Sequence, residues 1–273
     1  MGWIQGIILG VVQGLTEFLP VSSSGHLVLF QNLLGFKEPE LFFDICLHVG
    51  TLLAICLFFF RDLRDIVATI FAIPKRLNQG ESLREQFKKR PALRLALFVI
   101  LGTIPTGIIG IYIRSVSDVC FSSIRFVGFM LLVTGTILAL TKRFQKGGRD
   151  FLRFNVGDAL LIGLVQGLAV LPGISRSGAT ISMGLFAGLD RETAARYSFI
   201  LSIPAILGAL VMEWEVPIQG SLPGSVILVG TLAATIVGYA SLKLLMWLLK
   251  KGEFFFFAPY CWVLGVMAIG LSF

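Results

Sequence analysis

G-V-V-Q-G-L-T-E-F-L-P-V-S-S-S-G-H, residues 10–26, decides the fold, because residues 163–180 repeat it as G-L-V-Q-G-L-A-V-L-P-G-I-S-R-S-G-A-T. With small gaps the two copies align identical polar and helix-breaking residues. The aligned pairs are Gln13 with Gln166, Pro20 with Pro172, Ser24 with Ser177 and Gly25 with Gly178. A shared apolar composition alone would not align them. The sequence therefore predicts two repeats, residues 1–141 and 154–273, joined by a basic connector at 142–153.

The centre of each copy is rich in helix breakers. Proline removes a backbone donor, and glycine and serine are poor formers of helix interiors. Each copy is therefore predicted to be a re-entrant hairpin of two half-helices, over residues 2–34 and 156–189. A helix that breaks at membrane depth is tolerated only where protein or water satisfies the freed backbone groups. The breaks are thus expected to line a cavity.

The composition predicts an integral membrane protein. Of 273 residues, 56% are hydrophobic and 14% are charged, and the mean hydropathy is +0.87, which is outside the range of soluble domains. Six apolar segments are about long enough to cross ~30 Å of hydrocarbon. They are residues 41–60, 93–113, 124–140, 197–211, 226–249 and 254–273. We expect an all-α, polytopic fold in which three spans follow each hairpin.

The Lys and Arg residues predict the topology. Nine lie in residues 61–94 and five in 142–153, whereas 213–224 has none. Connectors rich in Lys and Arg are typical of the cytoplasmic side. With these connectors inside, three spans after a re-entrant hairpin reverse the direction of the next half, so the repeats are expected to be inverted. The bias also explains the net charge of +7 without a nucleic-acid partner.

Arg176 is expected at membrane depth, where a guanidinium costs at least ~2.5 kcal/mol and requires a partner. Two interpretations stay open: an ion pair with Glu17 that pins the hairpins together, and a bidentate clamp on phosphate. The clamp is favoured because both breaks open a half-helix, whose N–H groups and dipole attract anions. The phosphate-binding residues expected at the two breaks are Ser22, Ser24, Gly25, Ser175, Arg176, Ser177, Gly178 and Thr180.

Gln13 and Glu17 are four residues apart, so they share one face of the first half-helix. Glu17 is expected to face the cavity, where it could hold a divalent cation or act as a general base. His26 is assigned to the site because it follows the serine run closely. His48 is interpreted as a packing or hydrogen-bonding residue. For Asp44 the packing and the cavity interpretations both stay open.

Residues 13–26 and 171–180, read together, resemble the undecaprenyl-diphosphate phosphatases of the bacitracin-resistance type. The spacing of the two blocks, the chain length and the order of apolar segments also fit this family. The resemblance implies hydrolysis of undecaprenyl diphosphate to undecaprenyl phosphate and inorganic phosphate. This recycles the lipid carrier for peptidoglycan and cell-wall synthesis and confers bacitracin resistance. It also implies a multi-pass protein of the bacterial inner membrane, with its site toward the periplasmic face.

The resemblance implies catalytic roles for Glu17, Ser23, His26 and Arg176, and a divalent cation, Mg²⁺ or Ca²⁺, near Gln13 and Glu17. Gln13 stands where many family members have Glu, which removes one of the two carboxylates of an acidic metal site. Ser23 is expected to attack the terminal phosphorus of a polyprenyl diphosphate lipid, with His26 or Glu17 as base. Direct attack by an activated water stays open. The sequence is compatible with a homodimer.

A transporter or flippase for a polyprenyl phosphate lipid is the alternative, because inverted repeats with broken helices are common in secondary transporters. Phosphate release by detergent-purified protein separates the two, since hydrolysis needs no membrane and no gradient. A receptor or a structural membrane protein would leave Glu17, His26 and Arg176 unexplained.

Overall fold

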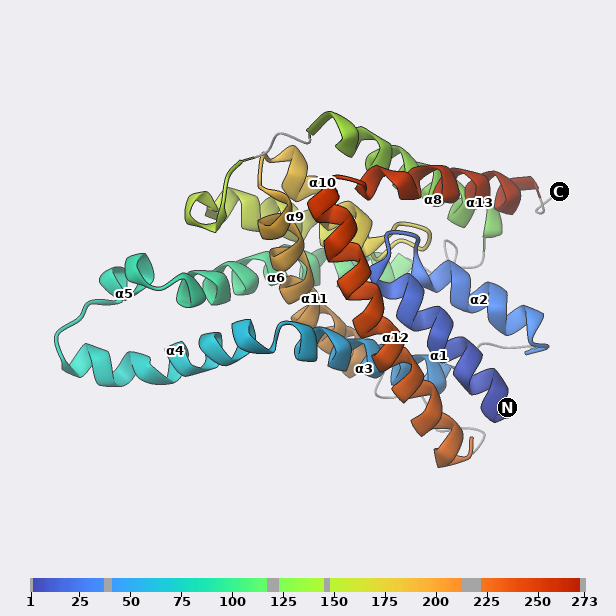
Figure 1. Ribbon diagram of the computed structural model, residues 1–273, viewed down its shortest axis with the longest axis horizontal. Helices are drawn as coiled ribbons and strands as arrows, with labels where there is room; N and C mark the ends of the chain where they lie inside the picture. Colours follow the sequence, from blue (N-terminus) through green and yellow to red (C-terminus); the bar gives the residue numbers. More distant parts are fainter. Residues whose placement is uncertain (1, 37–40, 117–122, 145–147, 213–221, 271–273) are drawn as a thin grey trace.

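The computed structural model describes residues 2–36, 41–116, 123–144, 148–212 and 222–270. Every regular element in these ranges is a helix, so the predicted all-α class is confirmed (Figure 1). The α-helices are α1 (Trp3–Phe18), α2 (Ser23–Leu33), α3 (Leu41–Phe58), α4 (Phe60–Asn78), α5 (Leu83–Lys89), α6 (Pro91–Val116), α8 (Ile124–Leu140), α9 (Val156–Leu168), α10 (Arg176–Phe186), α11 (Arg191–Met212), α12 (Gly224–Lys251) and α13 (Ala258–Gly270). The 3-10 helices are η1 (Thr141–Phe144), η2 (Phe151–Arg153) and η3 (Phe254–Phe257).

Four of these helices are long and apolar enough to cross a bilayer, namely α6, α8, α11 and α12. The bent pair of α3 and α4 makes a fifth if it is taken as one span. Large apolar side chains on the outward faces of the spans are exposed, as lipid-facing positions require. Examples are Ile100, Ile108, Leu228 and Ile236. The prediction of a multi-pass membrane protein is confirmed.

The bounds of two predicted spans differ most from the structure. The helix expected at 197–211 begins earlier, at Arg191, because the Asp190 carboxylate caps it by accepting from the Thr193 N–H at 2.7 Å. Charged residues in that first turn conceal the start from an apolar count. The span expected at 254–273 is a 3-10 turn followed by the 13-residue helix α13. Its last positions, 271–273, lie outside the described residues.

The segment 61–94, expected as a basic connector, is largely helical. α4 leaves the end of α3 with a bend of 76°. α4, α5 and the start of α6 then form an arm that projects from the bundle at the left of Figure 1. The reasons are local: a capping box of Ser82 and Glu85 begins α5, and Pro91 stands at the first position of α6, where its missing N–H is tolerated.

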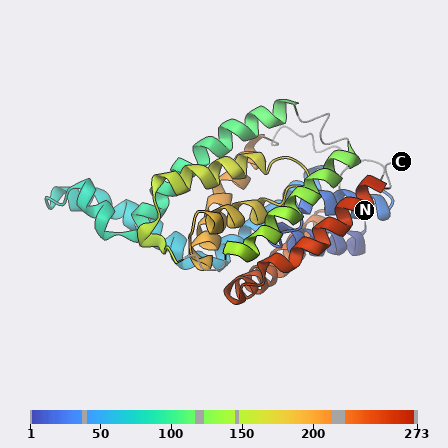
Figure 2. The ribbon, with the colours of Figure 1, turned by 90° about the horizontal axis from the view of Figure 1, so that it is seen from above.

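The two hairpins pack on equivalent helices of the opposite repeat. α1 packs along α12, and α9 packs along α6. α8 and α13, the last helices of the repeats, pack on each other and lie side by side in Figures 1 and 2. A Cβ on Gly10 would overlap the Gly230 carbonyl, and a Cβ on Gly163 would overlap that of Gly102. Such small-residue contacts are typical of membrane helix pairs. This exchange of partners fits a duplicated unit, and the inverted orientation stays a prediction.

An aromatic core anchors the helix that carries Glu17. Phe18, at the end of α1, packs edge-on against Phe199 of α11 with ring centroids 5.9 Å apart. Tyr197, two residues earlier in α11, donates its hydroxyl to the Phe98 carbonyl at 2.7 Å. These side chains are buried. The last turn of α1 is therefore tied to both α11 and α6.

Candidate active site

The first break lies between α1 and α2, over residues 19–22. Ser22 has φ of 68° and ψ of 98°, and it is the one non-glycine residue with positive φ in the described ranges. Such a conformation costs about 1–3 kcal/mol and persists only where the surroundings hold it. The turn brings Ser23 back to Glu17, six residues earlier.

Glu17 is the centre of the candidate site. The residue is only 8% exposed, and both carboxylate oxygens have partners. Oε2 accepts from Ser23 Oγ at 2.7 Å and from Gln13 Nε2 at 3.1 Å. Oε1 accepts from Arg176 Nη2, which comes from the second repeat. The structure thus brings together four of the predicted residues from both hairpins.

Arg176 is the first residue of α10, and its side chain is 19% exposed. Its ion pair with Glu17 is the first of the two interpretations that the sequence leaves open. A guanidinium carries five N–H donors in a planar fork, and the bond to Glu17 uses one nitrogen. The other donors can bind phosphate oxygens. The ion pair and the phosphate clamp are therefore compatible roles of one residue.

The second break uses its serines to cap a helix. Ser175 Oγ accepts from the Gly178 N–H at 3.1 Å, and the Ser175 N–H donates to Thr134 Oγ1 at 3.1 Å. Ser177 Oγ lies 3.3 Å from Ser175 Oγ. The Gly178 N–H is therefore engaged within the protein. A Cβ on Gly178 would lie 3.2 Å from the Cβ of Pro20, so the two breaks touch at this glycine.

The start of α2 has no side-chain cap. Ser22 occupies the cap position without capping any N–H of the first turn, and its Oγ lies 3.4 Å from Ser24 Oγ. Ser22 is buried, Ser24 is exposed, and Ser23 and Gly25 are half-buried. Uncapped N–H groups at a helix N-terminus favour anions. The phosphate-binding roles expected for Ser22, Ser24 and Gly25 stay predictions.

Thr180 lies outside this cluster. Its Oγ1 donates to the Arg176 carbonyl at 2.7 Å and contacts Ser198 Oγ on α11. The residue is fully buried. Its hydroxyl therefore supports α10 from the side of α11, and the structure does not bring it together with Glu17 and Ser23.

His26 forms a separate pair with a residue of the last helix. Its Nδ1 lies 2.8 Å from the Ser22 carbonyl, and because a carbonyl only accepts, Nδ1 carries a proton. In the neutral ring, Nε2 then accepts from the Tyr260 hydroxyl, 2.7 Å away. The two rings stack with centroids 5.8 Å apart and an interplanar angle of 10°. Both ring nitrogens are engaged, and neither bonds Ser23 or Glu17.

His48 lies closer to the centre than the packing interpretation implies. Its Nε2 is 3.9 Å from Glu17 Oε2, and its Nδ1 donates to the Asp44 carbonyl at 2.8 Å. The Asp44 carboxylate accepts from Gln31 Nε2 at 2.7 Å. His48 therefore borders the carboxylate, whereas Asp44 links α3 to α2.

The chain matches a known family along nearly its whole length. Residues 6–267 match the family described as Bacitracin resistance protein BacA. The undecaprenyl-diphosphatase of Desulfosudis oleivorans is 50% identical, over 98% of each chain. That of Desulforapulum autotrophicum is 49% identical, over 97% of this chain and 96% of the relative. The chain belongs to the BacA family. The resemblance predicted from the two motifs is confirmed.

Sequence reasoning misses one residue of this BacA-family site. Tyr260 contacts His26 across a separation of 234 residues. It lies in an apolar segment outside both motifs, where a tyrosine is an ordinary residue. No local pattern signals the contact, because it depends on how α13 packs beside the first hairpin.

The BacA-family chain offers few cation ligands at the breaks. The described residues contain no group of three or more His, Cys, Asp or Glu side chains that could hold a metal. Glu17 shares its carboxylate with Arg176. Gln13 Oε1, however, is buried without a hydrogen-bond partner, so it is an available neutral ligand. These two residues suit a cation that also binds substrate phosphates, as Mg²⁺ commonly does.

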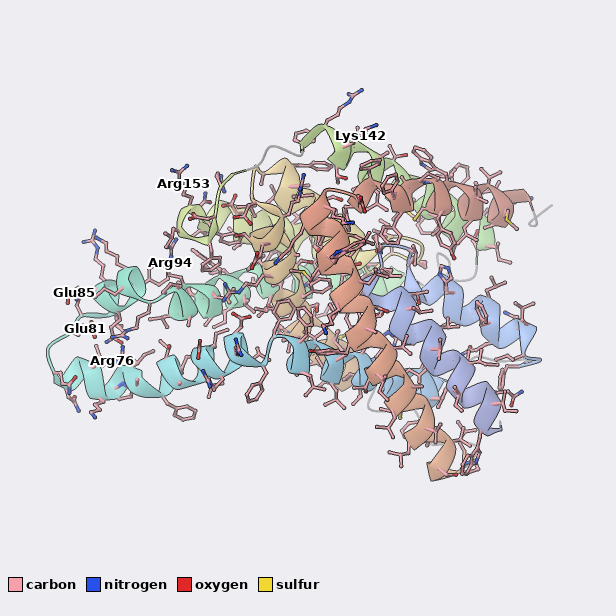
Figure 3. The ribbon with its side chains drawn as sticks, in the orientation of Figure 1. Arg76, Glu81, Glu85, Arg94, Lys142 and Arg153 are labelled. Atoms are coloured by element: carbon pink, nitrogen blue, oxygen red, sulfur yellow. The ribbon has the colours of Figure 1, made fainter. Side chains whose placement is uncertain are left out.

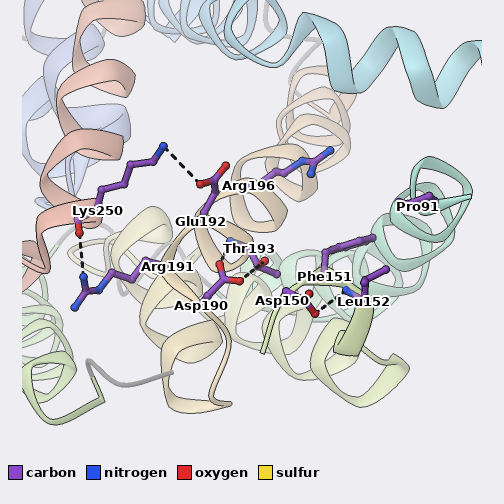
Figure 4. A pocket seen from close by; sticks show the side chains of 10 residues that line it. All are labelled: Pro91, Asp150, Phe151, Leu152, Asp190, Arg191, Glu192, Thr193, Arg196 and Lys250. Atoms are coloured by element: carbon purple, nitrogen blue, oxygen red, sulfur yellow. Dashed lines mark hydrogen bonds and ion pairs between the residues drawn. The ribbon is translucent and has the colours of Figure 1, made fainter. Parts of the chain in front are cut away.

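A cavity of about 720 Å³ lies elsewhere in this BacA-family chain, beside the starts of α6 and α11 and the end of α12 (Figure 4). One ion pair and one bond to a backbone carbonyl join α11 to α12 at this cavity. Lys250 Nζ lies 3.5 Å from the Glu192 carboxylate, and Arg191 Nη1 donates to the Lys250 carbonyl at 3.0 Å. None of the predicted site residues lines it. The cavity is thus separate from the cluster around Glu17.

Proposed function

We infer that this BacA-family protein is an undecaprenyl-diphosphatase, which hydrolyses undecaprenyl diphosphate to undecaprenyl phosphate and inorganic phosphate. One observation carries the inference: the Glu17 carboxylate contacts both the Ser23 hydroxyl and the Arg176 guanidinium. These groups can serve as base, nucleophile and phosphate ligand. Relatives that align over nearly the whole chain carry this enzyme name. The lipid-facing spans suit a lipid substrate.

In the proposed first step, Ser23 Oγ forms a bond to the terminal phosphorus while Glu17 takes the hydroxyl proton. The bond from this phosphorus to the bridging oxygen breaks, and undecaprenyl phosphate leaves with the electron pair. Glu17 Oε2 is 2.7 Å from Ser23 Oγ, within the range a general base needs. Because His26 contacts neither group, the geometry favours Glu17 over His26 as the base.

In the second step, water hydrolyses the phosphoserine. Glu17, having released its first proton to solvent, takes a proton from the attacking water and returns it to Ser23 Oγ as the P–Oγ bond breaks. Inorganic phosphate leaves and the serine is restored. Direct attack of a Glu17-activated water on the diphosphate is the alternative. A trapped phosphoserine at Ser23 would support the covalent route.

Charge neutralisation is assigned to Arg176 and the first turn of α2. Phosphoryl transfer depends on positioning and on groups that match the charge on the phosphate oxygens. The uncapped start of α2 offers backbone N–H donors, and Arg176 offers those not used by Glu17. A bound phosphate would share Arg176 with Glu17. That sharing weakens the ion pair and makes Glu17 a better base.

A divalent cation, Mg²⁺ or Ca²⁺, is proposed to bind together with the diphosphate. Gln13 Oε1 and Glu17 would hold it, since Gln13 Oε1 is a buried acceptor without a partner. When bound, the cation would supply positive charge to the phosphate oxygens. This proposal predicts that a chelator lowers phosphate release and that added Mg²⁺ restores it.

We further propose that the repeats are inverted and that the site faces the periplasmic side of the bacterial inner membrane. The Lys/Arg bias of the connectors supports this orientation. Single cysteines introduced at 213–224 and at 142–153 in a cysteine-free variant test it in whole cells. A membrane-impermeant thiol reagent should label the first set only, and labelling of the second set would contradict the orientation.

The decisive experiment is phosphate release by the purified full-length protein in detergent with undecaprenyl diphosphate. Glu17→Gln and Arg176→Ala should each lower turnover by about 10²–10³-fold, as expected for loss of a transition-state charge partner. Arg149→Ala is the matched control, because it also removes an ion pair, with Asp158, but outside the cluster. It should retain wild-type turnover.

Two results would contradict the proposal. Wild-type turnover in both Glu17→Gln and Arg176→Ala would show that the cluster is not the active site. Absence of phosphate release, with tight binding of the lipid retained, would favour transport of a polyprenyl phosphate lipid.

A further inference from the structure

α4 has a different surface from the spans. It contains no buried residue, although it is joined directly to α3 and lies beside α6. Plotted at about 100° per residue, its half-buried side chains fall on one side, apart from Leu63 near the bend, which packs on the core. The remaining surface divides into an apolar and a basic part. Figure 3 shows the arm with Arg76 on α4 and Glu81 and Glu85 near α5.

The apolar part is a continuous stripe that nothing in the described chain covers. Six side chains fall within an arc of about 120°, and all are exposed. They are Phe60, Val67, Ile70, Phe71, Pro74 and Leu77. Phe71, at the edge of the stripe, is 80% exposed. A contiguous apolar patch of this kind marks an interaction site or a membrane contact.

A basic stripe runs beside the apolar one. Arg61, Arg64 and Lys75 are exposed there, next to Phe71 on the helical wheel. Over residues 61–90 the arm has eight Lys/Arg and four Asp/Glu. The arm therefore carries a net positive charge, which complements an anionic surface and opposes contact with a second basic arm.

The direction of α4 suits a bilayer surface. α4 turns away from α3 by 76°. Where α3 runs along the bilayer normal, α4 must therefore run close to the membrane plane. A helix in this position, apolar on one face and rich in Lys and Arg beside it, has the form of an interfacial helix.

We propose that α4 binds the surface of the bilayer, with its apolar stripe inserted at the headgroup boundary and its basic stripe on the headgroups of anionic phospholipids. The depth of insertion of such helices, several ångströms, lets the apolar side chains reach the acyl chains while Arg and Lys remain at the phosphates. The arm is then a lateral membrane anchor. This proposal does not depend on the phosphatase assignment.

Site-specific photocrosslinking tests the proposal in the full-length protein, reconstituted in nanodiscs of phosphatidylcholine with a minority of phosphatidylglycerol. p-Benzoylphenylalanine replaces Phe71 in the apolar stripe or, as a control on the same helix, Asp65, which is exposed about 120° away from Phe71 on the helical wheel. After illumination, mass spectrometry counts lipid adducts at each position. We expect at least about fivefold more lipid adduct at 71 than at 65. An unchanged gel-filtration profile confirms folding of both variants.

The basic stripe is tested by Arg64→Gln combined with Lys75→Gln in the position-71 variant. With the native Arg64 and Lys75, phosphatidylglycerol should make up a larger fraction of the adducts than of the bilayer. In the double substitution, its fraction of the adducts should fall toward its fraction of the bilayer. Equal lipid adducts at 71 and 65, or adducts at 71 to a second protein copy, overturn the insertion. An unchanged phosphatidylglycerol share in the double substitution overturns the anionic-lipid contact.

Discussion

The two breaks have the same glutamine at aligned positions and use it differently. Gln13 donates to the Glu17 carboxylate at 3.1 Å. Its counterpart Gln166 donates to Thr106 Oγ1 and to the Leu201 carbonyl, both at 3.3 Å. The first glutamine adjoins the candidate reacting groups, and the second joins α9 to α6 and α11. An aligned residue in a duplicated unit therefore does not imply a shared role.

The helices that follow the two breaks, α2 and α10, also begin differently. α10 is capped by Ser175, in an ordinary extended conformation, and its break turns at Gly173 with φ of 92°. α2 follows the strained Ser22 and has no side-chain cap. The second break thus has a capped helix start, which stabilises the helix that carries Arg176. The first break keeps backbone donors available for a ligand, at a cost in conformational strain.

The largest expected effect on turnover comes from replacing a serine of the first break, whereas a serine of the second break should matter little. Ser23→Ala should lower phosphate release by about 10³-fold or more, because it removes the proposed nucleophile. Ser177→Ala, its control in the second break, should stay within about tenfold of wild type, since the Ser177 hydroxyl contacts that of Ser175, which caps α10. Steady-state release from purified protein measures both. Full activity in Ser23→Ala would leave water as the attacking group.

The next effect concerns the turns. Gly173→Ala should lower the free energy of unfolding by about 3 kcal/mol, because a Cβ there would overlap the Val127 carbonyl, approach Met130 Cβ within 2.8 Å and require positive φ. Gly25→Ala is the control in the first break, where the nearest atom would be 3.7 Å away. Thermal unfolding in detergent should show it at least as stable as wild type. Equal destabilisation by both substitutions would contradict this.

The aligned glutamines give a smaller contrast. Gln13→Ala should lower turnover by about 10–100-fold, since it removes a donor that orients Glu17. Gln166→Ala should leave the turnover of folded protein nearly unchanged and lower the free energy of unfolding by about 1–3 kcal/mol, through lost buried hydrogen bonds. Turnover and unfolding measured on the same preparations test both. A reversal of the two patterns would mean that the roles are exchanged.

The smallest expected effect tests the support of the first break by the last helix. Tyr260→Phe keeps the ring stack on His26 but removes the hydroxyl, so kcat should fall by about three- to tenfold with KM unchanged. Tyr260→Ala, which also removes the stack, should have the larger effect. If the rates of both variants equalled wild type, Tyr260 would have no part in positioning His26 and the Ser22 turn.

Local patterns predict much of this molecule. The breaks follow from proline, glycine and serine, and the helix predicted at 124–140 has the same bounds in α8. The ion pair of Glu17 with Arg176 is one of the two interpretations that the sequence leaves open. α4 is missed because its charged residues resemble a connector, although its apolar residues recur every three or four positions.

Contacts between distant helices cannot be predicted in this way. Nothing near Thr180 indicates that its hydroxyl contacts Ser198, because the residue that this side chain meets depends on how α10 packs on α11. The same holds for Tyr260 and His26. His48 is interpreted as a packing or hydrogen-bonding residue, yet the crossing of α3 and α1 brings it to 3.9 Å from Glu17.

The bond between Arg176 and Glu17 also has a consequence for biogenesis. The two residues are 159 positions apart, so at ~5–20 residues per second the ribosome reaches Arg176 roughly 8–32 s after Glu17. During that interval the nascent first half holds a carboxyl group whose cationic partner has not yet been made. An unpaired ionisable group in a bilayer is unfavourable. The newly inserted first half is therefore less stable in the bilayer than it becomes once Arg176 has been made.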